Sequence, residues 1–256
     1  MKNIAIVTGA SGGLGKEFVK LILEMPEIDE IWAMARSRDK LAALAAELGD
    51  KVKPYPADLS SIDAIKSFGE QMLSEDINVS ILVNNAGYAK FGSYGDIDVD
   101  ETVNMIDLNV NGVVAMALVC LPYMNKGAHM INIASQASFQ PLPYLNVYAA
   151  TKAFVRNYSR ALNLELRDRG ICVTAVCPGW IETPFFDRGL IGAEKTAKNF
   201  ANMSQPKDVA KKAMRDAMRG KDISVYSLYV KFCHAVAKLL PQRAMMRFWL
   251  LQQRLK

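Results

Sequence analysis

The 256-residue sequence has few histidines and cysteines, with two and four of them respectively. Its two histidines, His129 and His234, are far apart and near no cluster of acidic residues, which argues against metal catalysis. The cysteines form no Cys-x-x-Cys pair; they are Cys120, Cys172, Cys177 and Cys233. We therefore interpret them as reduced thiols of a cytoplasmic protein and expect no metal site.

Long hydrophobic runs are also absent. The richest, Val113 to Leu121, is shorter than the roughly 20 apolar residues that a membrane-spanning helix needs. Because residues 1–5 run directly into the first expected strand, we expect no cleavable secretory signal. There is no internal repeat, linker or low-complexity segment, so we expect one domain over residues 1–256.

Apolar residues make up 51% of the chain, enough to bury one substantial core. Apolar strand-like runs alternate with helical patterns. The expected strands are Asn3 to Thr8, Ile31 to Ala35, Val52 to Pro56, Ser80 to Val83, Ala128 to Ala134, Ile171 to Cys177 and Ile223 to Tyr226. This alternation predicts an α/β fold, a doubly wound Rossmann parallel sheet of about seven strands with helices on both faces.

The first strand ends in a glycine-rich turn, Gly9-Ala10-Ser11-Gly12-Gly13-Leu14-Gly15, followed by a helical pattern. Such a turn exposes backbone N–H groups at a helix N-terminus, where a pyrophosphate can bind. Gly9, Gly13 and Gly15 are the expected contacts. Their spacing is G-x-x-x-G-x-G instead of the commoner G-x-G-x-x-G, and a simple tight connection is the alternative.

The second strand ends at Arg36, where a dinucleotide-binding unit meets the adenosine ribose. Arginine there favours a 2′-phosphate, so NADP(H) is preferred and NAD(H) is possible. Alternatively, Arg36 and Arg38 begin a solvated helix. After the third strand, Asp58 is a candidate acceptor for the adenine amino group or a cap of the following helix.

Tyr148 and Lys152 are one helical turn apart, which puts a phenol and an ammonium on the same face. Each unit by which the phenol pKa falls requires about 1.4 kcal/mol of preferential stabilisation of the phenolate, which a nearby cation can supply. The pair is therefore a candidate general acid and base. Ser135 follows an expected strand at the sheet edge where open α/β sheets bind ligands, so its hydroxyl can donate to a carbonyl.

Taken in order, these motifs resemble the short-chain dehydrogenase/reductase family, in its single-domain branch. The matching motifs are Thr8-Gly-x-x-x-Gly-x-Gly15, Asn84-Asn85-Ala86-Gly87, Asn109, Ser135, Tyr148-x-x-x-Lys152, Pro178-Gly179 and Thr183. Each motif alone is weak evidence, whereas their order over most of residues 3–183 is specific.

The resemblance implies a catalytic tetrad. Tyr148 would donate or accept the proton, and Lys152 would lower the Tyr148 pKa and hold the nicotinamide ribose. Ser135 would polarise the substrate oxygen, and Asn109 would anchor a water in a proton relay. From the sequence alone, Asn109 could instead satisfy broken helix backbone. The implied cofactor contacts are Gly9, Ser11, Gly12, Gly13, Leu14, Gly15, Arg36, Asp58, Leu59, Asn84, Asn85, Ala86, Gly87, Tyr148, Lys152, Pro178, Gly179, Ile181 and Thr183.

The expected substrate is apolar. Residues 180–203 are interpreted as a lid over a mostly aromatic cleft. Expected substrate contacts are Ser135, Gln136, Tyr144, Tyr148 and Trp180, while Phe185 and Phe186 either join the cleft or belong to the core. We predict an NADP(H)-dependent oxidoreductase that interconverts a secondary alcohol and a ketone on a steroid, bile acid or lipid. The alternatives are a non-catalytic NADPH-binding regulatory protein and a 3-oxoacyl thioester reductase; the terminal strand and glycine-rich close of fatty-acid-synthesis reductases are not recognisable here.

The chain ends in a basic segment. From Gln205 onward twelve Lys or Arg stand against three Asp, a local excess of nine positive charges, compared with +5 for the whole chain. Residues 224–256 form an expected basic amphipathic extension, which either contacts an anionic membrane or acidic partner, or caps the cleft or a subunit contact. No nucleic-acid partner is expected.

Two helices, about Val99 to Asn125 and Asn146 to Arg169, are apolar around much of their circumference. In the family that the chain resembles, these helices form a dimer contact. We therefore expect a homodimer or homotetramer.

Overall fold

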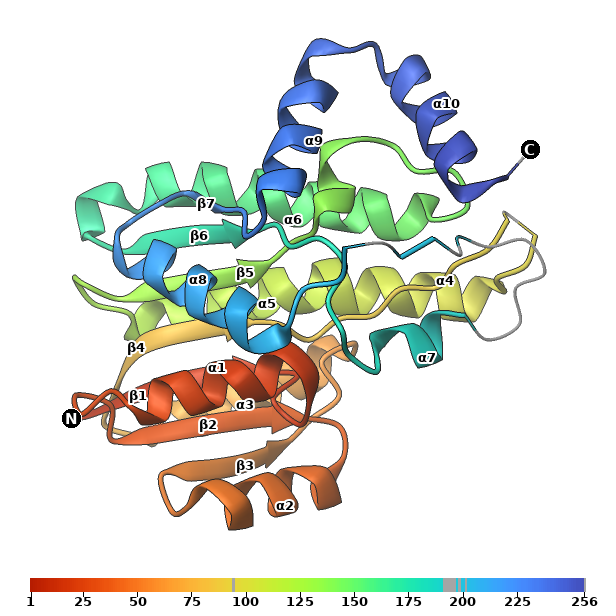
Figure 1. The fold of residues 1–256 in the computed structure, drawn as a ribbon. Helices are drawn as coiled ribbons and strands as arrows, with labels where there is room; N and C mark the ends of the chain where they lie inside the picture. The colour runs from red at the N-terminus through yellow and green to blue at the C-terminus, as the bar shows by residue number, and fades with distance from the viewer. Residues whose placement is uncertain (94, 191–196, 198, 201, 256) are drawn as a thin grey trace.

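A computed structural model gives the structure of residues 1–93, 95–190, 197, 199–200 and 202–255. Its centre is a parallel sheet of seven strands in the order β3-β2-β1-β4-β5-β6-β7 (Figure 1). The strands are β1 (Lys2–Thr8), β2 (Glu30–Ala35), β3 (Val52–Pro56), β4 (Ile77–Asn84), β5 (His129–Ile133), β6 (Cys172–Val176) and β7 (Ile223–Ser224). The predicted Rossmann fold and number of strands are confirmed.

The central strands are continuously apolar because helices cover both faces of the sheet. One layer contains α1 (Gly13–Leu23), α2 (Arg38–Leu48) and α8 (Pro206–Met218), whose apolar side chains pack in one core cluster with β1 and β2. On the other face α3 (Ile62–Met72) packs with the helices that follow β4. The strand order reverses between β1 and β4, which places a ligand crevice at their carboxyl ends.

One continuous helical run extends from Val99 to Tyr123. It consists of α4 (Val99–Ile106), a π-helical turn η1 (Asp107–Asn111), α5 (Gly112–Cys120) and a 3-10 turn η2 (Leu121–Tyr123). Among the described residues, it is the helix with the length and composition to span a membrane, contrary to the expectation drawn from Val113 to Leu121. Since 44% of its most apolar window is buried against the rest of the fold, this is weak evidence for a span.

The remaining helices complete the site. After β5, η3 (Gln136–Phe139) leads to α6 (Asn146–Glu165), which a 3-10 turn η4 (Arg167–Arg169) follows. After β6 come α7 (Phe185–Gly189) and α8. Of the predicted lid over 180–203, residues 191–196, 198 and 201 lie outside the described part of the chain.

The chain ends in a helical hairpin of α9 (Leu228–Leu239) and α10 (Gln242–Gln253), which rises from the sheet beside α6 (Figure 1). Pro241 separates the two helices because proline cannot continue the first of them. The indole of Trp249 is buried and donates from Nε1 to the Pro143 carbonyl at 2.9 Å. Gln253 exchanges two hydrogen bonds with the Asn199 backbone, at 2.8 and 3.1 Å.

Candidate active site

The glycine turn between β1 and α1 forms one end of the site. Gly9 and Gly13 have φ of +63° and +52°, in the left-handed region that favours glycine. A Cβ on Gly15 would lie 2.2 Å from the Gly9 carbonyl oxygen, so the turn packs closely on the first turn of α1. Gly12 faces open space, and no side chain caps α1. The first N–H groups of α1 are therefore free to receive an anion.

Side chains of β1 and β4 fix this turn. The backbone N–H groups of Asn85 and Ala86 donate to Thr8 Oγ1 at 2.9 and 3.0 Å. The Asn85 amide donates to the Thr8 and Gly9 carbonyls at 3.0 and 3.2 Å. Asn85 thus lines the cavity mainly as a brace for the turn.

Asn84 is directed into the core. Its amide donates to Asn132 Oδ1 at 2.9 Å, and Asn132 in turn donates to Ser159 Oγ at 2.9 Å, so the three side chains link β4, β5 and α6. Asn84 is absent from the described residues that line the cavity. A core hydrogen-bond chain thus holds this side chain, and the expected cofactor contact at Asn84 stays a prediction.

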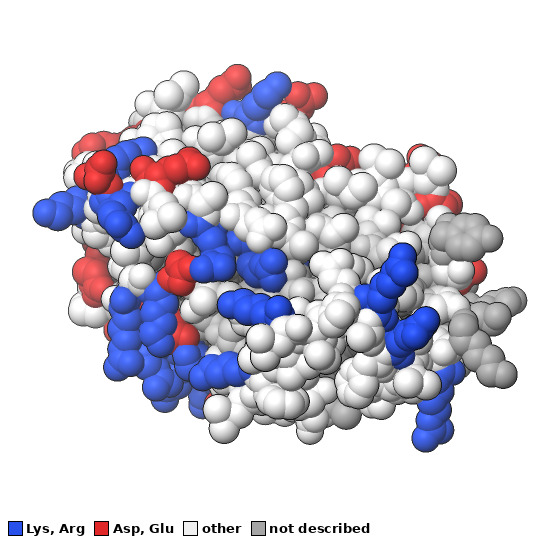
Figure 2. Space-filling view, turned by 90° about the horizontal axis from the view of Figure 1, so that it is seen from above, with Lys and Arg blue, Asp and Glu red and all other residues white. Residues whose placement is uncertain are grey.

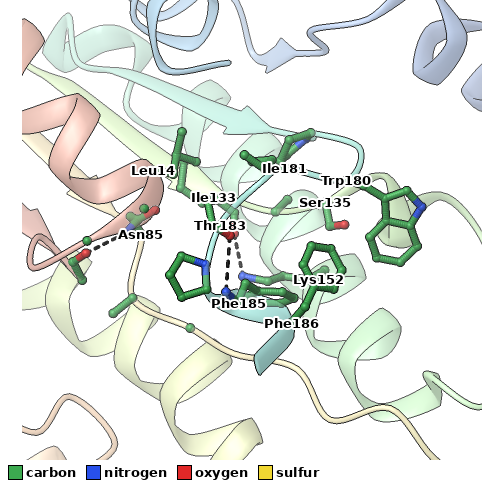
Figure 3. A pocket seen from close by; sticks show the side chains of 18 of the residues that line it. Leu14, Asn85, Ile133, Ser135, Lys152, Trp180, Ile181, Thr183, Phe185 and Phe186 are labelled. Atoms are coloured by element: carbon green, nitrogen blue, oxygen red, sulfur yellow. Dashed lines mark hydrogen bonds between the residues drawn. The ribbon is translucent and has the colours of Figure 1, made fainter. Parts of the chain in front are cut away.

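Ser135, Tyr148 and Lys152 come together on one cavity of about 450 Å³ that also includes the glycine turn (Figure 3). Asn85 lies toward one end of this cavity and Trp180 toward the other, with Ser135 and Lys152 between them. Ser135 is 9% exposed, and its Oγ accepts from the Ala137 N–H at 3.1 Å. This bond orients the hydroxyl and leaves its hydrogen for donation.

Most of the predicted cofactor contacts border the same cavity. They are Gly9, Ser11, Gly12, Gly13, Leu14, Asn85, Ala86, Gly87, Pro178, Gly179, Ile181 and Thr183. Gly15 packs against the Gly9 carbonyl, so it shapes the turn and does not itself line the cavity.

Burial dominates the protonation of Tyr148 and Lys152. It raises the pKa of Tyr148 to about 12, and the Ser135 hydroxyl opposes that shift. It lowers the pKa of Lys152 to about 8. Lys152 Nζ lies 5.8 Å from the centre of the Tyr148 ring and donates to the Ile133 carbonyl at 2.7 Å. The expected lowering of the Tyr148 pKa by Lys152 is therefore not found in the chain alone, since the ammonium is directed to a carbonyl.

Asn109 is fully buried in the π-helical turn, a type of turn that often occurs at functional sites. Its Oδ1 accepts from the Tyr88 N–H at 3.1 Å, and its amide donates to the Tyr88 carbonyl at 2.9 Å and to Thr151 Oγ1 at 3.2 Å. A Cβ on Gly87 would lie 2.8 Å from Asn109 Oδ1 and 3.4 Å from Lys152 Nζ. Asn109 thus holds the loop after β4 beside Lys152. Its side chain bonds to Tyr88 and Thr151 and not to backbone groups of its own helix.

A second cavity of about 430 Å³ continues past the glycine turn to the ends of β2 and β3. It shares Gly9, Ser11, Lys40, Ala86 and Gly87 with the first, so the two form one elongated cleft. Arg36, Ser37, Lys40 and Leu59 line it. The sequence prediction did not include Lys40, which lies four residues after Arg36, in the first turn of α2 (Arg38–Leu48). Arg38 begins α2, and Ser37 caps that helix by accepting from the Lys40 N–H at 3.3 Å.

Asp58 does not cap the next helix. That position belongs to Ser61, whose Oγ accepts from the Ala64 N–H at 3.3 Å. The Asp58 carboxylate instead accepts from the Ser60 N–H and hydroxyl at 3.0 and 2.8 Å. The capping alternative for Asp58 is wrong because the helix begins three residues later than that alternative required.

Comparison with known proteins decides the family. The model of the short chain dehydrogenase family matches residues 3–189. The chain belongs to this family. An uncharacterised oxidoreductase of Staphylococcus aureus (strain N315) is 30% identical over 237 residues, 90% of this chain and 96% of the relative.

Two solved structures extend the comparison. A short-chain dehydrogenase from Sphingobium yanoikuyae in complex with NADPH is 25% identical, with a TM-score of 0.79 over 96% of this chain and 95% of that one. The closed form of a serine dehydrogenase complexed with NADP⁺ is 32% identical, with a TM-score of 0.74 over 87% and 93% of the two chains. This short-chain dehydrogenase is therefore an oxidoreductase, and its relatives support a nicotinamide cofactor.

The cleft of this short-chain dehydrogenase fits a nicotinamide dinucleotide. The uncapped N-terminus of α1 offers N–H donors to a pyrophosphate, and Gly12 leaves room for it. Arg36 and Lys40 are exposed at the adenosine end. The described residues that line the cleft include no Asp or Glu.

The substrate end of the dehydrogenase cleft is covered by the C-terminal hairpin. A small cavity of about 60 Å³ adjoins Ser135, Gln136 and Trp180. Its hairpin residues, none of which the sequence identified as site residues, are Tyr229, Cys233, Met245, Phe248, Trp249 and Gln252. The inner face of the extension thus caps the cleft, and contact of its outer face with a membrane or partner stays a separate prediction. Tyr144 is absent from the described residues lining either substrate-side cavity.

Aromatic rings form much of the remaining wall. Phe185 packs edge-on against Tyr148 at 5.7 Å between ring centres. The centre of the Phe186 ring lies 4.6 Å from that of Phe200 and 5.7 Å from that of Trp180. Phe185 and Phe186 both line the cavity, so they contribute to the site as well as to packing.

Proposed function

We propose that the protein is an NADP(H)-dependent oxidoreductase that interconverts a secondary alcohol and a ketone on an apolar substrate. The observation that carries this proposal is the shared cavity. It brings the Ser135 hydroxyl, the Tyr148 phenol and the Lys152 ammonium to the same space as the uncapped end of α1.

Ser135, Tyr148 and Lys152 have separate roles in reduction of the ketone. When bound, the nicotinamide supplies the hydride that the carbonyl carbon accepts. Ser135 donates a hydrogen bond to the carbonyl oxygen as negative charge develops there. Tyr148 gives its proton to that oxygen, which forms the alcohol and leaves a phenolate. Lys152 stabilises the phenolate until the proton is restored from solvent.

The walls of the substrate end support an apolar substrate. Phe185, Phe186 and Trp180 offer aromatic surface next to Tyr148 and Ser135, and the hairpin adds Met245 and Phe248. A steroid, bile acid or lipid-like ketone matches this chemistry because burial of its apolar surface against these side chains is favourable.

The test is oxidation of NADPH, followed at about 340 nm, with ketosteroids, bile acids, quinones and acyl thioesters. We expect turnover with an apolar ketone, and Tyr148→Phe should lower kcat by about 10²- to 10⁴-fold, the usual contribution of general acid catalysis. NADPH binding, measured by fluorescence, should be retained in this variant. Binding without turnover in the wild type would favour the regulatory alternative, and turnover of acyl thioesters alone would favour the thioester reductase.

The preference for NADP(H) rests on Arg36 and Lys40 at the adenosine end. A charged hydrogen bond contributes about 1.5–3 kcal/mol, so Arg36→Asp should raise the KM for NADPH by about 10- to 150-fold and favour NADH. Arg38→Asp is the matched control, because Arg38 is exposed on the same segment but does not line the cleft. If the ratio of kcat/KM with NADPH to kcat/KM with NADH is the same in Arg36→Asp as in the wild type, Arg36 does not bind the 2′-phosphate.

A further inference from the structure

The C-terminal hairpin exposes a large apolar surface. Its members, here called the hairpin surface, are Leu228, Phe232, Leu239, Leu240, Phe248 and Leu251. Leu228, Leu239 and Leu251 are 81%, 83% and 76% exposed. Exposed apolar patches on globular proteins usually mark interaction sites, and six large exposed apolar side chains on one helical hairpin are a candidate for such a patch.

The hairpin is anchored from its inner side, so this exposure is not that of a loose terminus. Val230 on α9 and Met245 and Trp249 on α10 are buried. The Trp249 indole and the Gln253 amide hold α10 to the loop before α6 and to Asn199. Each helix therefore has one face fixed on the fold and one face directed outward.

The charge around the hairpin surface has one sign. Lys231, Lys238, Arg243 and Arg247 are exposed on the same two helices. Between Ile223 and Leu255 the sequence contains no Asp or Glu. Figure 2, which looks onto this end of the molecule, shows a broad uncharged area with Lys and Arg side chains on its left and right sides, and Asp and Glu side chains toward the top and the right edge.

The exposed apolar side chains and the basic residues around them indicate which kind of partner the hairpin surface binds. A second copy of the chain, docked about a twofold axis, would place the same basic residues opposite one another without any acidic partner on the hairpin. Large aliphatic and aromatic side chains flanked by Lys and Arg are instead the composition of helices that lie in a membrane interface. We propose that the hairpin surface docks on the surface of an anionic phospholipid bilayer.

Docking there would also orient the catalytic cleft. Phe248 is 59% exposed as part of the hairpin surface and also lines the small cavity beside Ser135 and Trp180. The substrate end would then face the lipid, from which an apolar ketone could enter. This last step rests on the proposed function, whereas membrane docking does not.

The experiment is sedimentation of the full-length protein with vesicles, either phosphatidylcholine alone or phosphatidylcholine with about one third phosphatidylserine, in about 0.1 M salt. We expect binding to the anionic vesicles, weakened at about 1 M salt, where the Debye length falls from about 10 Å to about 3 Å. Leu239→Ser and Leu251→Ser should each weaken binding at least about threefold, because each removes apolar area that the interface would bury.

Leu73→Ser is the matched control, since Leu73 is 78% exposed on a different part of the fold, at the end of α3. Lys238→Glu should weaken binding, whereas Lys66→Glu on α3 should not. An unchanged melting temperature would show that the variants fold. No binding to anionic vesicles, equal binding to both vesicle types, or equal effects of Leu239→Ser and Leu73→Ser would overturn the proposal. So would a hairpin variant that dissociates an oligomer without altering vesicle binding. None of these readouts requires turnover, so they remain interpretable if the proposed reaction fails.

Discussion

At the level of single residues, burial shifts the pKa of both Tyr148 and Lys152 away from the ordinary value of each group. The spacing of Tyr148 and Lys152 and the position of Ser135 after β5 predicted three side chains that line one cavity in the structure. The direction of the pKa shifts depends on contacts from elsewhere in the chain. Phe185 packs edge-on against the Tyr148 ring, and the Ile133 carbonyl accepts a hydrogen bond from Lys152 Nζ. No local pattern around residues 148–152 encodes either contact.

The pKa of Lys152 leads to a pH prediction. Burial lowers this pKa from 10.5 to about 8, so the ammonium is present below about pH 8 and is lost as the pH rises through that value. Tyr148 stays protonated over the same range, because its pKa is about 12. If the ammonium stabilises the developing phenolate, kcat/KM for ketone reduction should fall about tenfold per pH unit above about 8.

This profile is measured as kcat/KM for the ketone at saturating NADPH between about pH 6 and 10, so that it includes the proton transfer from Tyr148. Lys40→Arg is the control. It keeps a positive charge in the cleft throughout this range, so the fall should persist in that variant. A profile that stays flat to about pH 10 in the wild type would show that the charge on Lys152 is not needed for reduction.

At the level of helices and strands, continuous apolar runs in the sequence predicted the positions of the buried strands. All seven strands lie where the apolar runs predicted them, although β4 begins at Ile77, three residues before the expected start. The polar interruption around Asn109 was visible in the sequence, but its π-helical form was not. That form accompanies two distant contacts. Asn109 bonds the Tyr88 backbone, and Gly112 packs so closely that a Cβ would lie 2.5 Å from the Leu59 carbonyl oxygen.

The boundaries between elements explain the remaining errors at the site. Asp58 and Ser61 are both good helix caps, and Ser61 is the cap because α3 begins at Ile62, directly after it. Lys40 reaches the cleft because α2 begins at Arg38, immediately after the Ser37 cap. Similarly, the apolar stripe after residue 228 predicted helices, but the bond from Trp249 to Pro143 determines which face covers the substrate end.

At the level of the whole molecule, a second apolar face lies on helices outside the hairpin. It is formed by the helices around Val99 to Tyr123 and by α6, and its exposed members are Val99, Val103, Ile106, Leu118, Phe154 and Leu164. The π-helical turn between α4 and α5 packs against α6, so these helices lie side by side. Unlike the hairpin, this part of the chain carries acidic residues, among them Asp100, Glu101 and Glu165, so repulsion between like basic charges does not oppose self-association here.

We predict that this face joins two or four copies of the chain. Leu118→Glu combined with Phe154→Glu would place carboxylates in the contact, and burial of an unpaired charge costs several kcal/mol, so association should weaken by at least about 10²-fold. Molecular mass measured by light scattering should change from that of a dimer or tetramer to 28.3 kDa. Leu73→Glu, an equally large change at a 78% exposed leucine on α3, should leave the assembly intact. A wild-type protein that is monomeric at micromolar concentration would contradict the prediction and leave this face to another partner.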